Sequence, residues 1–174
     1  MVYKAAAFAT AEGLLVFGGQ NPNRLYYNRI YEWTESTNTW QVLDLCPFDL
    51  DADIPHFQYQ GRYYFINRQN EVHVFDPNAV EWSFIGIYPG QVGGGGISVV
   101  MKDRVFVGIF TGENDIWEMD LLTNRWILKN GFIGEENDVN VSYWQNEGEI
   151  FLIKDNFFGA GVDMPIYKFN PDAF

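Results

Sequence analysis

A short aromatic phrase recurs four times along this chain and constrains the fold more than any other feature. Its copies are Ile30-Tyr31-Glu32-Trp33, Val72-His73-Val74-Phe75, Ile116-Trp117-Glu118-Met119 and Ile166-Tyr167-Lys168-Phe169. Ten residues after the start of each of the first three copies stands a tryptophan: Trp40, Trp82 and Trp126. A spacing of roughly 45 residues between aromatic, strand-like segments indicates a repeat architecture in which each repeat is one supersecondary unit.

Each phrase belongs to a longer unit with the same order of parts. Two short apolar runs joined by a tight turn precede the phrase, and the second run opens at Gly13, Gly61, Asp103 or Gly148. The runs are rich in β-branched and aromatic residues, which are typical of strands. The unit therefore reads strand, turn, strand, variable loop, strand, turn and Trp-led strand. This predicts an all-β propeller of about four antiparallel four-stranded blades, at 5–46, 53–89, 96–133 and 139–174.

The fourth unit is shorter than the others. The chain stops at Phe174, before the position where a fourth tryptophan is expected, so we predict that the last blade lacks its outer strand. Because natural proteins cover open sheet edges, three arrangements are possible. Residues 1–4 supply the missing strand, another copy or another chain completes the ring, or the chain is a fragment of a longer propeller. We expect completion by another chain or copy, as a homo-oligomer or a complex, because four blades leave a tight channel.

The units resemble kelch repeats, which carry a double glycine after the second strand, an aromatic on the third and a tryptophan opening the fourth. The double glycine is kept as Gly18-Gly19 and replaced by Ile66-Asn67, Gly108-Ile109 and Ile153-Lys154. The resemblance covers nearly all 174 residues. It implies a propeller with WD40-like architecture, a fold that hosts both binding modules and enzymes.

Composition is consistent with a single domain over residues 1–174. Hydrophobic residues make up 47% of the chain, which is ample for a core. No apolar run is long enough to span a membrane and the first residues lack the apolar stretch of a signal peptide, so we expect no membrane insertion. Cys46 stands alone, which excludes an internal disulfide and slightly favours the cytoplasm. An extracellular origin stays open if the chain is a fragment.

The charge of the chain is concentrated in acidic loops. A net charge of −12 argues against nucleic acid as a partner. In an antiparallel blade, the loop from second to third strand and the loop to the next blade leave at the same end. The sequence therefore predicts one acidic loop face that attracts a basic protein. The alternative is that these acids only keep the protein soluble. They are Asp49, Asp51, Asp53, Glu113, Asp115, Glu135, Glu136, Asp138, Asp155 and Asp163.

The loops from second to third strand vary in length, while the strands around them keep their spacing. Variable loops on a constant scaffold are where recognition is usually placed. Two of them carry Tyr, Phe and Arg, which are typical interface anchors. The alternative is that these aromatics fold back over the blade edge. Our candidate partner-binding residues are Arg24, Tyr26, Tyr27, Asp51, Asp53, Glu113, Asp115, Phe157, Phe158 and Asp163.

Searches for catalytic and metal-binding patterns give no site. His56 and His73 are the only histidines, and we expect both to be structural. The acidic run at 49–53 lacks the glycine and glutamate of an EF-hand loop, and a looser calcium site stays open. The glycines at 93–96 lack a following Gly-Lys-Ser/Thr, so we expect them to permit close backbone approach rather than to bind phosphate.

The sequence thus predicts a non-enzymatic protein-interaction module without catalytic residues, metal or cofactor. The alternative is a propeller that binds or processes carbohydrate, in which aromatic rings stack on sugars beside carboxylates. We expect Trp40, Trp82 and Trp126 to be buried as part of the repeat, which leaves Trp117 and Trp144 for that second role.

Overall fold

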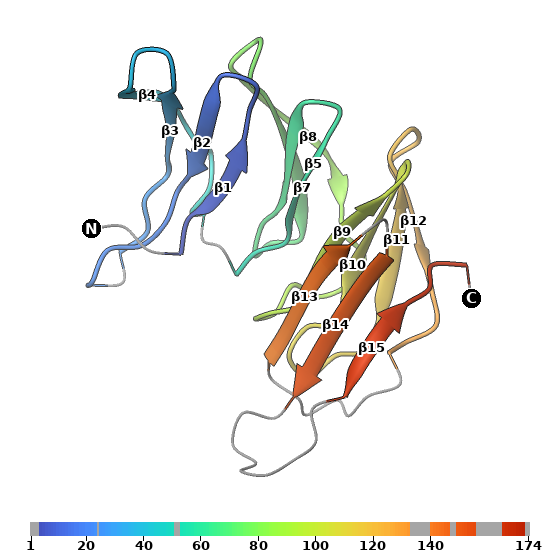
Figure 1. The fold of residues 1–174 in the computed structure, drawn as a ribbon. Coiled ribbons are helices and arrows are strands. Elements are labelled where there is room, and N and C mark those ends of the chain that lie inside the picture. Colours follow the sequence, from blue (N-terminus) through green and yellow to red (C-terminus); the bar gives the residue numbers. More distant parts are fainter. Residues whose placement is uncertain are drawn as a thin grey trace. The chain divides into compact units, whose positions relative to one another are not determined.

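The computed structural model describes residues 4–23, 25–50, 53–132, 140–146, 149–155 and 165–172. Strands and turns account for all the regular structure in these residues, and they form four antiparallel sheets (Figure 1). The chain divides into two compact units, Met1–Gly86 and Ile87–Phe174, each with two of the sheets.

The first unit holds two four-stranded sheets. Sheet 1 contains β1 (Ala6–Ala9), β2 (Gly13–Phe17), β3 (Arg29–Thr34) and β4 (Thr39–Leu45), in that order. Sheet 2 contains β5 (His56–Tyr59), β6 (Arg62–Ile66), β7 (Glu71–Asp76) and β8 (Glu81–Ile87), also in order. Each strand is a neighbour of the strand that follows it in the chain, which is the meander of a propeller blade.

The second unit repeats this arrangement. Sheet 3 contains β9 (Ile97–Met101), β10 (Arg104–Gly108), β11 (Ile116–Asp120) and β12 (Arg125–Leu128). Sheet 4 contains β13 (Asn140–Asn146), β14 (Glu149–Asp155) and β15 (Ile166–Phe169). The prediction of an all-β propeller with four blades, the last one short of its outer strand, is confirmed for the described part of the chain. Of residues 1–4, which the sequence offered as a closing strand, residues 1–3 lie outside it.

The turns between third and fourth strands use the side chains that the sequence suggested. Asp76 accepts a hydrogen bond from the Asn78 backbone N–H at 3.0 Å, and Asp120 accepts one from Leu122 at 2.8 Å. These backbone bonds are the main reason that the pKa of each carboxyl lies below its usual range. Ionised aspartates thus fix the two equivalent turns.

Strand β4 contains one irregularity. Ile30 pairs with Asp44 and Tyr31 with Val42, which leaves Leu43 unpaired as a β-bulge. Leu43 packs against the hydrophobic core of the first unit. The bulge therefore turns one additional side chain inward from an edge strand.

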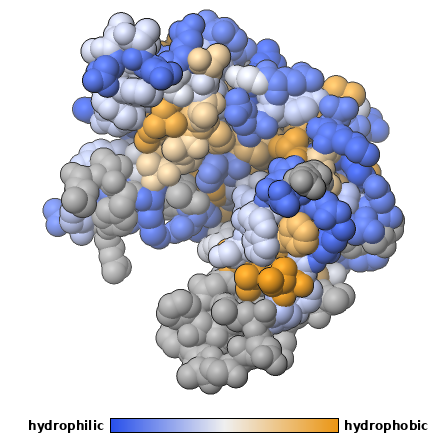
Figure 2. All heavy atoms as spheres, in the orientation of Figure 1, coloured by the Kyte–Doolittle hydropathy of each residue, from blue (hydrophilic) through white to orange (hydrophobic). Residues whose placement is uncertain are grey.

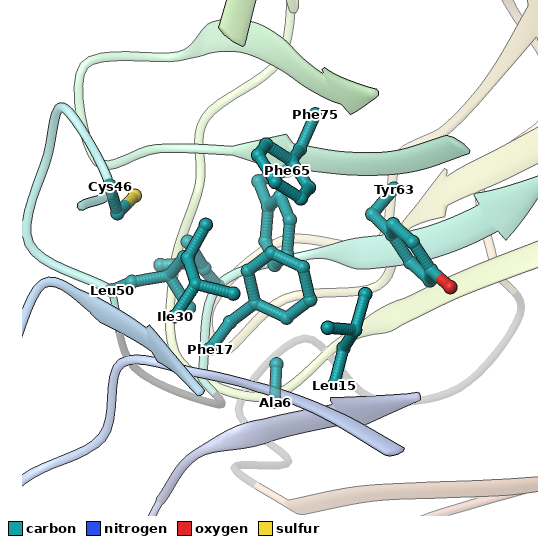
Figure 3. Packing of buried hydrophobic residues seen from close by; sticks show 10 residues of the cluster. Ala6, Leu15, Phe17, Ile30, Cys46, Leu50, Tyr63, Phe65 and Phe75 are labelled. Carbon is teal, nitrogen blue, oxygen red and sulfur yellow. The ribbon is translucent and has the colours of Figure 1, made fainter. Parts of the chain in front are cut away.

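Aromatic rings from both sheets form the core of the first unit (Figure 3). Phe17 of β2 and Phe65 of β6 are fully buried, with ring centroids 4.9 Å apart. Trp82 of β8 packs against Phe17, Phe65 and Phe75, with centroids 5.2–6.3 Å away. The core therefore holds sheet 1 against sheet 2, and each buried ring contributes roughly 1.5–3 kcal/mol.

The second unit has a core of its own between sheets 3 and 4. Phe106 of β10 and Phe169 of β15 meet edge to face, with centroids 5.1 Å apart. Phe132 and Tyr167 make a second contact of this kind, at 4.7 Å. Aliphatic side chains fill the space around these rings, and the buried ones are Ile97, Val99, Ile109, Ile116, Ile150 and Leu152.

The expectation that all three repeat tryptophans are buried is wrong for Trp40. Trp82 is half-buried and packs against the core of the first unit, and Trp126 is half-buried against Tyr88, with ring centroids 5.1 Å apart. Trp40 is 56% exposed. Trp82 is covered because its face of sheet 2 packs on the preceding sheet, and sheet 1 has no sheet before it in the described chain.

Candidate functional site

The loop between β2 and β3 lies against the segment that follows β4. Gly19 donates its backbone N–H to the carbonyl oxygen of Leu50 at 3.0 Å, and Cys46 donates to Asn28 at 2.5 Å. Gly18 has a φ of 62°, and a Cβ there would lie 2.4 Å from the Leu50 oxygen. These contacts place both loops at the same end of sheet 1, as the antiparallel order of its strands requires.

The β2–β3 loop is shaped by its own hydrogen bonds. The Asn21 side-chain oxygen accepts from the N–H groups of Asn23 and Leu25, at 2.9 and 3.0 Å. Leu25 is 63% exposed and Tyr26 43% exposed, whereas Tyr27 is half-buried. The loop thus presents an aliphatic and an aromatic side chain from a held backbone, and only Tyr27 is partly folded back.

Asp53, a predicted contact residue, already has an intramolecular partner. The ammonium group of Lys4 lies 2.5 Å from its carboxylate, and both side chains are exposed. An exposed ion pair of this kind contributes little to stability. Asp53 therefore offers less free negative charge to a partner than an isolated carboxylate would.

Glu113 and Asp115 share the loop between β10 and β11 in the second unit. The Thr111 backbone N–H and its hydroxyl both donate to the carbonyl oxygen of Gly94, each at 3.0 Å. The carboxylate of Glu113 accepts a backbone hydrogen bond from Gln91. These three hydrogen bonds join the loop to Gly94 and Gln91 in the segment between β8 and β9. The two acids therefore lie on a loop that is anchored at two points.

Burial and the charge of Asp115 both act on the carboxyl of Glu113. Burial raises the pKa of Glu113, the charge of Asp115 raises it further, and the Gln91 hydrogen bond opposes the rise. Burial also raises the pKa of the Tyr88 hydroxyl, and the two carboxylates add to this effect. A second negative charge close to a partly buried carboxyl makes its ionised form unfavourable. A cation at this point would therefore relieve an unfavourable charge.

Aromatic rings stand beside the two carboxylates. The Tyr88 ring centroid lies 6.5 Å from that of Trp117 and 6.3 Å from that of Phe110. A Cβ added at Gly90 would approach the Tyr88 hydroxyl to 2.5 Å and the Trp117 indole nitrogen to 2.9 Å. That indole nitrogen is buried and makes no hydrogen bond in the structure. Tyr88 was missed in the sequence because it lies outside the repeated phrase.

Five of the ten predicted contact residues lie outside the described part of the chain: Arg24, Asp51, Phe157, Phe158 and Asp163. The structure brings Tyr26 and Tyr27 onto one loop of the first unit, near the segment that leads to Asp53. It brings Glu113 and Asp115 together in the second unit. The candidate site is thus described as two groups, one in each unit.

The two histidines have structural partners. The His56 Nδ1 atom lies 2.9 Å from the Ile54 carbonyl oxygen, and the His73 Nε2 atom lies 3.2 Å from a Glu71 carboxylate oxygen. Burial raises the pKa of Cys46 to about 12, so its thiol is a poor nucleophile. Within the described ranges, no group of three His, Cys, Asp or Glu side chains is placed to hold a metal ion. Those ranges also contain no helix with the length and apolarity to cross a membrane.

The blades define the class of protein as a β-propeller. No family model matches the chain, and no curated protein matches it. Among solved structures it is similar to one titled "Structure of YjhT", with a TM-score of 0.70 and 16% sequence identity. The match covers 87% of this chain and 58% of that one, so the chain spans less than two thirds of that structure. At this identity the likeness concerns the fold alone.

Proposed function

We propose that this chain is a non-enzymatic, kelch-like interaction module that binds a basic segment of a protein or peptide at the loop end of its blades. The observation that carries the proposal is the pair Glu113 and Asp115. They are held together on an anchored loop in a chain with a net charge of −12, although their charges oppose each other. A lysine or arginine side chain placed beside both acids would offset part of their charge and reduce their mutual repulsion.

The β2–β3 loop supports the same function through a different kind of contact. Leu25 and Tyr26 are exposed on a loop whose backbone is already ordered by Asn21. A preordered loop loses little conformational entropy on binding, and an exposed tyrosine is a typical interface anchor. Binding would therefore combine apolar anchors with charge attraction.

The kelch-like assignment rests on the pattern of repeat residues. Gly18 and Gly19 both have positive φ, 62° and 103°, where the kelch double glycine is expected. Trp40, Trp82 and Trp126 lie near the start of β4, β8 and β12. These positions support a kelch-type blade within the broader propeller class.

A basic peptide provides the test of the acidic contact. We expect an oligolysine or oligoarginine peptide to bind with an affinity that falls as salt rises, measured by titration calorimetry. The double variant Glu113→Gln/Asp115→Asn should weaken binding about tenfold, because a close charge pair is lost. The same peptide with glutamate in place of its basic residues should not bind.

A matched control separates a site from overall charge. Glu12 and Glu35 lie in the turns at the other end of sheet 1, where the Glu35 N–H donates to the Glu12 carbonyl at 2.9 Å. Glu12→Gln/Glu35→Gln removes the same charge and should leave affinity nearly unchanged. Equal weakening by both double variants, or no binding at any salt concentration, contradicts the proposal.

A carbohydrate-binding propeller is the second candidate. It is favoured by one observation, the half-buried Trp117 beside Tyr88 and two carboxylates, since aromatic faces and acids together suit sugar rings. Saturable binding of a simple sugar in calorimetry, lost in Trp117→Ala and kept in Trp144→Ala, would support it. A glycan array without hits, together with flat calorimetric titrations, would dispose of it.

A further inference from the structure

One face of sheet 1 is apolar across all four strands and lies on the side away from sheet 2. Two rows of directly paired residues form this face, and paired residues in a sheet point to the same side. The first row is Ala9, Leu14, Trp33 and Trp40, and the second is Ala7, Val16, Tyr31 and Val42. Trp40 is 56% exposed and Val42 is 51% exposed. We call these two rows the leading face of sheet 1.

The corresponding face of sheet 2 is covered within the first unit. Trp33 of sheet 1 and Phe75 of sheet 2 are at equivalent positions on the third strand. Leu14 pairs with Trp33 as Tyr63 pairs with Phe75, and Trp40 follows Trp33 at the same interval as Trp82 follows Phe75. In sheet 2 these positions are part of the core, where Tyr63, Phe75 and Trp82 pack on sheet 1. The leading face of sheet 1 thus has the residues of a blade interface, but within the first unit no described sheet packs on it.

Sheet 4 carries the opposite half of such an interface. Its outward pairs are Trp144 with Phe151 and Ser142 with Ile153, continued onto β15 by Lys168 and Ile166. The equivalent residues of sheet 1 face sheet 2: Phe8 pairs with Leu15, and Phe17 pairs with both Ala6 and Ile30. We call the sheet 4 set Ser142, Trp144, Phe151, Ile153, Ile166 and Lys168 its trailing face.

Within the second unit, no described sheet covers this trailing face. Ile30 in sheet 1 is 0% exposed beneath sheet 2, whereas its counterpart Ile166 is 62% exposed. Trp144 is 42% exposed and stacks on Phe151, with centroids 5.6 Å apart and an interplanar angle of 17°. Orange spheres in Figure 2 show strongly hydrophobic residues at the molecular surface, where apolar patches often mark association sites.

We propose that the leading face of sheet 1 in one copy of this chain packs on the trailing face of sheet 4 in a second copy. The chain carries both halves of the interface that holds sheet 2 on sheet 1, and within its own unit each half has no described sheet packed on it. A second copy supplies the missing half for either face through a head-to-tail contact, and a ring that closes covers both faces of every copy. This proposal does not depend on the acidic loop site.

Self-association provides the first test. We expect the full chain to form oligomers at micromolar concentration, measured by sedimentation velocity and mass photometry. Trp40→Glu should weaken association by about 30-fold or more, because a buried tryptophan anchor becomes a desolvated charge. Leu122→Glu is the matched control, since Leu122 is 75% exposed in the turn after β11 and lies on neither face.

Cross-linking provides the second test and does not depend on a destabilising substitution. Trp144 in sheet 4 is at the position of Phe8 in sheet 1, and Val16 in sheet 1 is at the position of Phe65 in sheet 2. The rings of Phe8 and Phe65 lie 6.1 Å apart across the interface between sheets 1 and 2. Chains with Val16→Cys and chains with Trp144→Cys, each carrying a different tag, should therefore join into a mixed covalent dimer with a short bismaleimide. Cys46 is 2% exposed and remains in all variants. Tyr143→Cys, on the other face of sheet 4, should give no mixed dimer with Val16→Cys.

Three outcomes overturn the proposal. If the chain is a monomer at all concentrations, the two faces do not bind each other between copies, and further blades or another protein would cover them. Association that Trp40→Glu leaves unchanged places the contact elsewhere. A chain carrying both Val16→Cys and Trp144→Cys that cross-links within itself, without mixed dimers in the two-chain experiment, shows that the faces pair in one copy. Loss of peptide binding in the acid variants bears on none of these results.

Discussion

Glu113 illustrates how the site and the stability of the fold are coupled. Burial, and then the charge of Asp115, raises the pKa of its carboxyl. Because the folded state holds this proton more tightly than the unfolded chain, the group contributes stability below its usual pKa. That contribution is lost as the pH rises through the folded-state pKa.

The variant Glu113→Gln should therefore raise the thermal unfolding midpoint at pH 7, by about 1 °C or more. The difference from the original chain should shrink toward about pH 4, where the glutamate is protonated. Scanning calorimetry at both pH values checks this, with Glu12→Gln as a surface control. An advantage that is larger at pH 4 than at pH 7 would contradict the assigned sign.

Gly18 tests the contact between the two loops of sheet 1. Alanine there adds a methyl group 2.4 Å from the Leu50 carbonyl oxygen at a φ of 62°. Gly61 is the control, because its φ is 76° and a Cβ there meets nothing within 4 Å. We expect Gly61→Ala to cost about 1–2 kcal/mol from backbone strain alone. Gly18→Ala should cost clearly more in urea unfolding, and equal costs would deny the tight contact.

At the scale of strands and sheets, equivalent tryptophans have unequal roles. Trp82 contacts four aromatic rings, including Phe17 and Phe48, whereas Trp40 faces solvent. Trp82→Ala should cost about 3–5 kcal/mol in denaturant unfolding, because its ring packs against four aromatic rings at the core. Trp40→Ala should cost under about 1 kcal/mol at concentrations where the chain is monomeric. Similar costs for both would mean that Trp40 is covered.

Strand order, the turn aspartates and the shortened last blade could all be predicted from the sequence, because each depends on local pattern. The close approach expected at the glycine run also appears, since a Cβ at Gly96 would lie 2.4 Å from the Phe110 ring. The exposure of Trp40 could not be predicted, because it depends on which sheet precedes the first blade. The position of Tyr88 beside the two acids and the burial of Glu113 could not be predicted either. Both depend on the contact between the β10–β11 loop and the segment between β8 and β9.

At the scale of the whole molecule, each of the two units has its own buried core. Because each core is formed within one unit, local unfolding is expected to follow the units. Phe106→Ala removes a ring of the second core and should cost about 3–5 kcal/mol there. Hydrogen exchange should rise across Ile87–Phe174 and change little across Met1–Gly86. A uniform rise over the whole chain would show that the units unfold together.

The bulge at Leu43 has a consequence for how this protein avoids uncontrolled fibre growth. The outermost strand of a sheet is a template for further strands, and a bulge disrupts the regular hydrogen-bonding edge that such growth copies. Strand β4 has this irregularity, whereas β15 pairs with β14 in unbroken register and has no fourth strand beyond it in the described residues. Amyloid-like addition should therefore occur more readily at β15 than at β4, whose edge is interrupted by the bulge.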